Sequence, residues 1–211
     1  MFNLHTHTKS KNAIINIDDK TLINDDLFYS AGIHPWYNYF SINNIEQLIK
    51  TKSNIIAIGE CGIDKLKSQY SISKQIELLT AQIKLSEQYQ LPLILHIVKG
   101  FNEIIKLKKD LKPNQPWIIH GFNKYKQAKN LIDEGFYLSF GKALTINNKL
   151  QTVFKDLPNT HIFLETDDNA IEIEKIYTFA SELKAIKTKQ LIKDINKNLT
   201  TVFNGKLVRK T

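Results

Sequence analysis

Residues 55–60, Ile55-Ile56-Ala57-Ile58-Gly59-Glu60, decide the fold. An apolar run that ends in a glycine is typical of a strand buried on both faces, as in a parallel sheet. Similar runs occupy residues 93–95, 117–119, 136–138 and 162–164. Helical stretches with one apolar face separate these runs, for example Ile72, Ile76, Leu79 and Ile83. This alternation predicts an α/β protein with a parallel sheet.

The first third of the chain has a different pattern. Residues 2–7, 13–17 and 28–33 are predicted strands, but the links between them are too short for crossover helices, which usually need about a dozen residues. These strands bring the predicted total to eight. We therefore expect a distorted (β/α)8 barrel of the TIM type with the early crossover helices missing, which accounts for a length of only 211 residues. No linker divides the sequence, so residues 1–211 are predicted to form one domain.

Composition narrows the function classes. No apolar run is long enough to cross a bilayer, and the N-terminus lacks the pattern of a signal peptide. Cys61 is the only cysteine, which excludes an internal disulfide and fits a reducing compartment, so we expect a cytoplasmic location. We expect no association with a membrane, and no obligate protein partner is evident from the sequence. The net charge of +8 favours a polyanionic partner such as nucleic acid, but it fits a lysine-rich solvated surface equally well.

Polar residues recur where the predicted strands end. The set comprises His5, His7, Glu60, His96, His120 and Asp167. In an α/β barrel the carboxyl ends of the strands converge on one mouth, where catalytic groups gather from several strands. A single His-x-His is more often incidental, and a histidine at a strand end can simply be a satisfied interior residue. Because four of the six histidines fall at such positions, we interpret the set as metal ligands.

Six nitrogen and oxygen donors are enough for two divalent cations that share one carboxylate. Such ligands suit Zn, Mn, Fe or Ni, and Mg less readily. A bound cation lowers the pKa of water toward about 7, so ions held here would make water available as a nucleophile at neutral pH.

The chain resembles the TatD family of metal-dependent deoxyribonucleases. The resemblance rests on seven segments in the family's order: Leu4-His5-Thr6-His7, Gly32-Ile33-His34-Pro35, Gly59-Glu60-Cys61-Gly62-Ile63-Asp64, Leu95-His96, Ile119-His120-Gly121-Phe122, Tyr137-Leu138-Ser139-Phe140-Gly141 and Leu164-Glu165-Thr166-Asp167. It implies that His5, His7 and Asp167 bind one ion, that His96 and His120 bind the other, and that Glu60 bridges them. Glu60 and Asp167 are the expected catalytic carboxylates, and Asp167 would also accept a proton from the attacking water.

The chain departs from the family pattern around the expected substrate. Trp36 follows His34-Pro35 where a histidine is frequent, and Ile97-Val98-Lys99 follows His96 where an arginine is common a short way on. His34 is the best candidate for contacting a substrate phosphate, and Lys99 is a second one, although a solvated loop lysine is equally consistent with its position. Trp36 and Tyr37 could stack on a base or simply pack in their loop.

These features predict a divalent-metal-dependent hydrolase that cleaves phosphodiester bonds of DNA, with single strands or ends as the expected substrate. The alternative hypothesis keeps the two metals and changes the substrate to a small-molecule amide, ester or phosphate, since barrels of this kind support many reactions. A non-enzymatic, basic nucleic-acid-binding protein is a further alternative, which the complete ligand set disfavours.

Overall fold

The computed structural model describes residues 1–37 and 39–207. Its eight strands follow one another in the sheet in the order of the sequence, from β1 to β8. They are β1 Asn3–Thr6, β2 Ala13–Asn16, β3 Phe28–Ala31, β4 Ile55–Asp64, β5 Leu93–Val98, β6 Trp117–Ile119, β7 Tyr137–Phe140 and β8 Ile162–Leu164. Each of the eight predicted strands is thus confirmed, with shifted ends in most cases.

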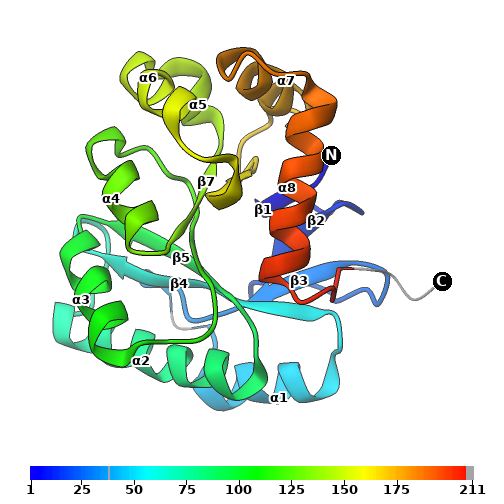
Figure 1. The fold of residues 1–211 in the computed structure, drawn as a ribbon. Coiled ribbons are helices and arrows are strands. Elements are labelled where there is room, and N and C mark those ends of the chain that lie inside the picture. Colours follow the sequence, from blue (N-terminus) through cyan, green and yellow to red (C-terminus); the bar gives the residue numbers. More distant parts are fainter. Residues whose placement is uncertain (38, 208–211) are drawn as a thin grey trace. The chain divides into compact units, whose positions relative to one another are not determined.

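The helices follow the later strands, as the sequence predicted (Figure 1). They are α1 Ile42–Thr51, α2 Ile72–Tyr89, α3 Phe101–Leu111, α4 Ala128–Asp133, α5 Lys142–Ile146, α6 Asn148–Asp156, α7 Ile173–Leu183 and α8 Thr188–Val202, with 3-10 turns η1 Tyr125–Gln127 and η2 Asn159–His161. Within the described residues no helix lies between β1 and β2 or between β2 and β3, which confirms the missing early crossover helices. No described helix is both long and apolar enough to cross a bilayer.

The chain divides into two compact units, which we call the first unit (residues 1–15 and 120–211) and the second unit (residues 16–119). The prediction of a single domain over residues 1–211 stays a prediction.

The second unit is built around β4, whose ten residues are all buried. This strand pairs in parallel with β3 on one side and β5 on the other. Helix α2 packs on β4 and buries Leu79 and Ile83, while α1 packs on α2 (Figure 1). Serine side chains cap both helices, Ser41 on α1 and Ser71 on α2, because each hydroxyl accepts a free N–H of the first turn.

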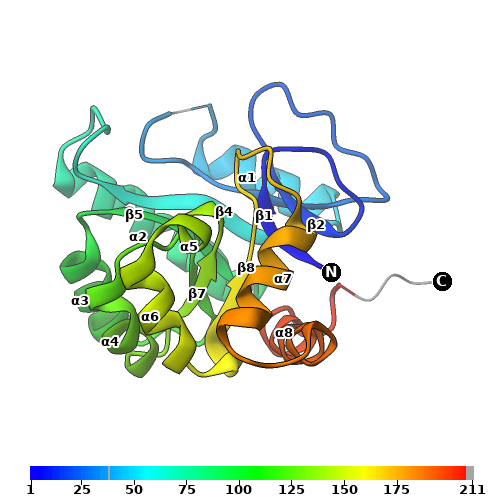
Figure 2. The ribbon, with the colours of Figure 1, turned by 90° about the horizontal axis from the view of Figure 1, so that it is seen from above.

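The first unit contains the parallel pairs β1–β2 and β7–β8, and an isolated bridge joins Thr6 of β1 to Asp167 after β8. Helix α7 packs on β8, and α8 packs on α7, on β8 and on η2 (Figure 2). Gly135, which directly follows the C-cap Glu134 of α4, has a φ of 76°, the left-handed conformation in which helices commonly end on a glycine.

Strands β4 and β5 extend further than the sequence predicted. Glu60 and His96 were expected at strand ends, but they lie inside β4 and β5, because the ladder continues through the pairs Cys61–Leu95 and Gly62–His96. The register shifts between Ile58 and Cys61, so β4 carries an additional residue at this bulge. Gly62 has a φ of +145°, and a Cβ there would collide with the carbonyl oxygen of His96.

We therefore expect Gly62→Ala to lower the free energy of unfolding by about 3 kcal/mol, since it combines an unfavourable φ with a backbone collision. Urea denaturation measures the loss. Gly205→Ala is the matched control, because Gly205 has a φ of +71° and nothing within 4 Å of the added Cβ. It should cost only about 1 kcal/mol. Equal losses in the two variants would contradict the close packing at Gly62.

Candidate metal-binding clusters

The sequence-predicted site residues gather in two clusters, each inside one unit. The Asp167 cluster, in the first unit, consists of His5, His7, His120, Glu165 and Asp167. The Glu60 cluster, in the second unit, consists of His34, Trp36, Glu60, Asp64 and His96.

Two imidazoles face one carboxylate oxygen in the Asp167 cluster. Nε2 of His5 lies 3.6 Å and Nε2 of His7 3.4 Å from Oδ1 of Asp167. The ring of His120 has its centroid 4.3 Å from that of His5. One donor atom each of His5, His120 and Asp167 lie within 4.8 Å of one another, an arrangement that can hold a metal ion. Imidazole nitrogen with carboxylate oxygen is the donor set of zinc and of similar transition metals.

Backbone pairing brings the donors of this cluster together. The N–H of Asp167 donates to the carbonyl of His5 at 3.0 Å, and the N–H of His7 donates to the carbonyl of Asp167 at 3.3 Å. The buried amide of Asn3 adds a clamp, since it donates to Oγ1 of Thr166 at 2.7 Å and accepts the N–H of Thr166 at 3.0 Å. Asp167 has a φ of 54°, a left-handed conformation that Asp tolerates better than most residues. The turn aims its carboxylate at His5 of β1 and at His7, which directly follows this strand.

The Asp167 carboxylate is held in its charged form. Burial raises its pKa, but hydrogen bonds from His5 and His7 and the charge of His120 lower it more, so the net pKa shift is downward. Asp167 is therefore a carboxylate at neutral pH, able to ligate a cation or to accept a proton.

Glu165 orients His120 from the buried side. Its Oε1 accepts the N–H of Gly121 at 2.6 Å and lies 3.4 Å from Nδ1 of His120. A carboxylate behind a histidine of this kind fixes the ring orientation of a metal ligand. The structure groups His120 with His5 and Asp167, whereas the resemblance implied that it shares an ion with His96.

Two imidazoles also face one oxygen in the Glu60 cluster. Oε1 of Glu60 lies 3.1 Å from Nε2 of His34 and 2.9 Å from Nδ1 of His96. The N–H of Glu60 donates to Oδ1 of Asn16 at 2.7 Å, which anchors the bulge of β4. Sequence reasoning missed Asn16, although a polar residue directly after the apolar run 13–15 was a signal that could have found it.

Asp64 supports His96 from the opposite side. Its Oδ1 accepts the N–H groups of Leu66 and Lys67, and its Oδ2 accepts Nε1–H of Trp36 at 2.7 Å. Burial raises the pKa of Asp64, but these hydrogen bonds and that from His96 outweigh burial and hold the pKa at about 2. Asp64 is therefore ionised, and its Oδ2 lies 3.1 Å from Nε2 of His96, which donates its proton there.

The surroundings of His96 fit a cation. A neutral imidazole carries one proton, yet both nitrogens of His96 face carboxylate oxygens, Nε2 toward Asp64 and Nδ1 toward Glu60. With the proton on Nε2, the lone pair of Nδ1 faces an oxygen that is also an acceptor. Either a second proton or a cation held jointly by Nδ1 and Oε1 relieves this repulsion. Donor atoms of His34, Glu60 and His96 lie within 4.8 Å of one another, which meets the spacing a metal ion needs.

His34 is arranged as a hydrogen-bond donor. The N–H of Trp36 donates to its Nδ1 at 3.1 Å, so the proton of the neutral ring lies on Nε2, facing Glu60. Trp36 itself packs edge-on against His34 and His96, with Lys67 Nζ 4.2 Å above its ring. Trp36 is thus a packing residue of the cluster.

Lys99 is set apart from these contacts. It follows β5 with a φ of 55°, its side chain is exposed, and it forms no hydrogen bond or ion pair with any residue in the described part of the chain. Its predicted role as a phosphate contact stays a prediction.

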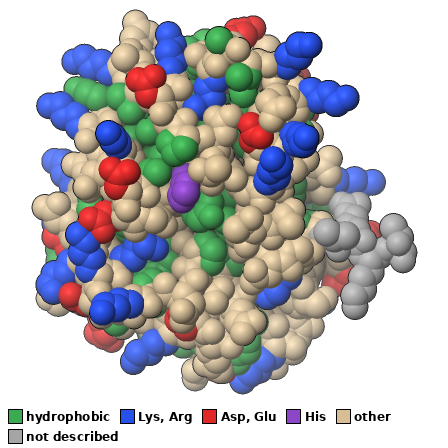
Figure 3. Space-filling view, in the orientation of Figure 1, with side chains coloured by type: hydrophobic (Ala, Val, Ile, Leu, Met, Phe, Trp, Pro, Cys, Tyr) green, Lys and Arg blue, Asp and Glu red, His purple; other side chains and the backbone are tan. Residues whose placement is uncertain are grey.

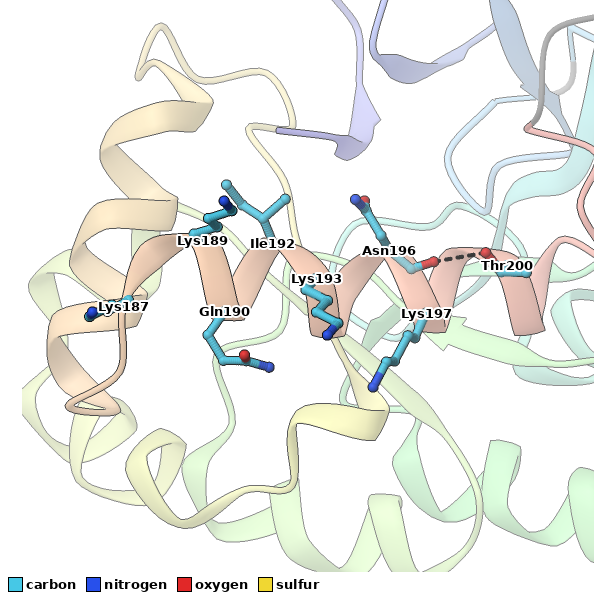
Figure 4. Close-up of a pocket in the computed structure, with 8 residues that line it drawn as sticks. All are labelled: Lys187, Lys189, Gln190, Ile192, Lys193, Asn196, Lys197 and Thr200. Atoms are coloured by element: carbon cyan, nitrogen blue, oxygen red, sulfur yellow. Dashed lines mark hydrogen bonds between the residues drawn. The ribbon is translucent and has the colours of Figure 1, made fainter.

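A groove of about 690 Å³ runs along α8, away from the donors of the Asp167 cluster in the same unit. It is lined by Lys187, Lys189, Gln190, Ile192, Lys193, Asn196, Lys197 and Thr200 (Figure 4). The neighbouring Asn198 donates to the carbonyl of Ile162, at the amino end of β8, whereas Asp167 follows the carboxyl end. On the face in Figure 3, Lys and Arg side chains are spread out among carboxylates. On this face, the positive charge therefore does not mark a site.

Known proteins resemble this chain in sequence and in fold. The family described as TatD related DNase matches residues 1–204. A protein of Haemophilus influenzae named as an uncharacterized metal-dependent hydrolase is 30% identical, covering 74% of this chain and 66% of that protein. A protein of Enterocytozoon bieneusi, named provisionally as a deoxyribonuclease TATDN1 homolog, is 31% identical, covering 76% of this chain and 62% of its own length. The chain thus spans a little under two thirds of these two relatives.

Among solved structures, the TatD homologue YjjV of Escherichia coli K12 superimposes with a TM-score of 0.78 at 22% identity, covering 91% of this chain and 86% of that one. A TatD family hydrolase of Entamoeba histolytica superimposes with a TM-score of 0.71 at 19% identity, covering 84% and 74% of the two chains. These superpositions agree with the strand order of the sheet and confirm the TIM-type (β/α)8 fold. The match over residues 1–204 establishes that the chain belongs to the TatD-related DNase family.

Proposed function

We propose that this chain is a divalent-metal-dependent hydrolase that cleaves phosphodiester bonds of DNA. The observation that carries the proposal is the pair of clusters in which imidazole nitrogens face one carboxylate oxygen, Oδ1 of Asp167 and Oε1 of Glu60. Relatives with 30–31% identity are named as a metal-dependent hydrolase and, provisionally, as a deoxyribonuclease, which supports the same assignment.

The proposed ligands are His5, His7, His120 and Asp167 in one cluster and Glu60 and His96 in the other. That Glu60 bridges two ions remains part of the proposal, as does the choice among Zn, Mn, Mg, Ni and Fe. When bound, such ions supply a water of lowered pKa and draw charge from a phosphoryl oxygen. Asp167, ionised at neutral pH, accepts the proton of the attacking water. Asp64 keeps the proton of His96 on Nε2, so that Nδ1 stays available as a ligand.

His34 is the proposed phosphate contact. Its Nδ1 is held by the N–H of Trp36, and its Nε2–H points into the cluster toward Oε1 of Glu60, so the ring is fixed as a donor that a non-bridging phosphate oxygen entering the cluster would accept in place of Glu60. A fixed donor aimed at developing negative charge is worth more than a mobile one. Lys99 is proposed to add a point charge from its exposed position after β5.

The first test compares wild type with Glu60→Ala and Glu60→Gln. We expect both variants to lose bound metal and most hydrolysis of single-stranded DNA, because Oε1 of Glu60 is the oxygen on which His34 and His96 converge. Elemental analysis and a nuclease assay measure the two losses. Glu103→Gln, which alters a carboxylate paired with Lys65 outside both clusters, is the control and should behave like wild type.

Two results would contradict the proposal. Nuclease activity that survives both Glu60 substitutions would mean that another site performs the chemistry. If the metal-loaded wild type hydrolyses small esters or amides but does not cleave DNA, its substrate is a small molecule, as in the alternative hypothesis.

The second test separates a phosphate contact from a metal ligand at His34. We expect His34→Ala to lower kcat/KM on an oligonucleotide by roughly 100-fold, the usual loss for one fixed donor to a developing charge. Metal content should stay at the wild-type level, because Nδ1 is engaged by the N–H of Trp36 and Nε2 carries the proton. His34→Gln, which retains an N–H, should recover part of the activity. If the His34→Ala variant instead loses metal, His34 is a metal ligand and the proposed phosphate contact is wrong.

A further inference from the structure

Three aromatic rings form a row that begins in the Glu60 cluster. The ring of Tyr37 stacks on His34 with centroids 5.4 Å apart and an interplanar angle of 30°. The ring of Tyr39 stacks on Tyr37 at 5.0 Å and 16°. The row therefore leads from the proposed phosphate contact out to the surface, through residues of the loop between β3 and α1.

The outer two rings are accessible. Tyr37 is 44% and Tyr39 50% exposed, although burying an aromatic ring is favourable. Trp36, which directly precedes Tyr37, is less accessible to a ligand, because its Nε1–H donates to Asp64 and Lys67 covers a face of its ring. The two tyrosines are thus the aromatic surface that this loop presents to a ligand.

The charged residues near Tyr39 indicate which part of a nucleic acid can bind at this end of the row. Burial and the carboxylates of Asp19 and Asp18 raise the pKa of Tyr39 above its ordinary value near 10, so the side chain is neutral at pH 7 and has two carboxylates in its vicinity. These two carboxylates make the position less favourable for a phosphate than for an uncharged group. A flat, uncharged ring is accepted, since stacking on an aromatic face needs no charge.

We propose that Tyr39, supported by Tyr37, stacks a nucleobase of a single-stranded nucleic acid whose phosphate lies at the Glu60 cluster. The base would extend the row His34–Tyr37–Tyr39 by one more ring. Because Tyr39 is two ring separations from His34, the stacked base belongs to a nucleotide that flanks the phosphate being cleaved. This inference rests on the proposed function and deepens it, since it makes the loop between β3 and α1 the element that distinguishes a nucleic acid from a small phosphoester.

The test compares two strands that differ only in their bases. A labelled strand of twelve thymidines and an abasic strand of the same length carry the same phosphates. Fluorescence anisotropy in EDTA measures the dissociation constants of both without cleavage. We expect wild type to bind the thymidine strand at least about 10-fold more tightly, which corresponds to the usual contribution of one stacked base. Tyr39→Leu should bring this ratio close to one, and Tyr37→Leu should reduce it.

Two control variants make the result specific. Tyr39→Phe keeps the ring and should keep the preference for bases. Tyr89→Leu makes the same chemical change at the last residue of α2, outside the row, and should also keep it. A ratio near one in wild type, or a ratio that survives Tyr39→Leu, would overturn the proposal. Loss of the ratio in Tyr39→Phe would do so too, because the hydroxyl would then be responsible.

Failure of the stacking proposal is distinguishable from failure of the proposed function. Stacking is measured in EDTA and needs no activity, whereas the nuclease assignment is measured by metal-dependent cleavage of the same strand. If the protein cleaves the strand but shows no preference for bases, the proposed function stands and the stacking proposal is wrong. If the protein prefers the strand with bases but does not cleave it, the stacking proposal stands and the nuclease assignment is wrong.

Discussion

The convergence of imidazole nitrogens on a single carboxylate oxygen is the interaction on which the account depends. It occurs at Oδ1 of Asp167 in the first unit and at Oε1 of Glu60 in the second. Nitrogen lone pairs and carboxylate oxygens repel one another unless a proton or a cation lies between them. His96 makes the requirement plain, because both of its nitrogens face carboxylates. A proton or a cation can meet this requirement, and we propose that a cation does so at each cluster.

Hydrogen bonds behind the donors keep them in position. Asp64 stays charged because two backbone N–H groups and the indole of Trp36 donate to it, and it then fixes the proton of His96. Glu165 performs a similar task for His120, and the amide of Asn3 fixes the turn that carries Asp167. These supporting residues are buried, so the donors are held in place before any ion or substrate arrives.

Sequence reasoning located the strands, and it selected most of the side chains that form the two clusters, because both follow local rules. Buried parallel strands are short apolar runs, and functional groups of a barrel sit near the carboxyl ends of those runs. It failed for features that depend on contacts between residues distant in the sequence or on the conformation of a loop. Strands β4 and β5 continue past Glu60 and His96 because Gly62 allows the backbones to approach, and a pattern of apolar residues does not reveal such a continuation. The proton on Nε2 of His34 depends on the N–H of Trp36, a contact set by loop conformation. Asn16 and Asn3 act through partners distant in sequence, which no single-sequence pattern reports.

Anomalous diffraction from crystals of the manganese-loaded protein tests the central claim most directly. We expect anomalous peaks at both clusters, one in contact with His5 and Asp167 and one in contact with Glu60 and His96. The neighbours of the two peaks would also decide with which ion His120 binds. Absence of anomalous density from both clusters, in crystals whose manganese content is established by elemental analysis, would contradict the account.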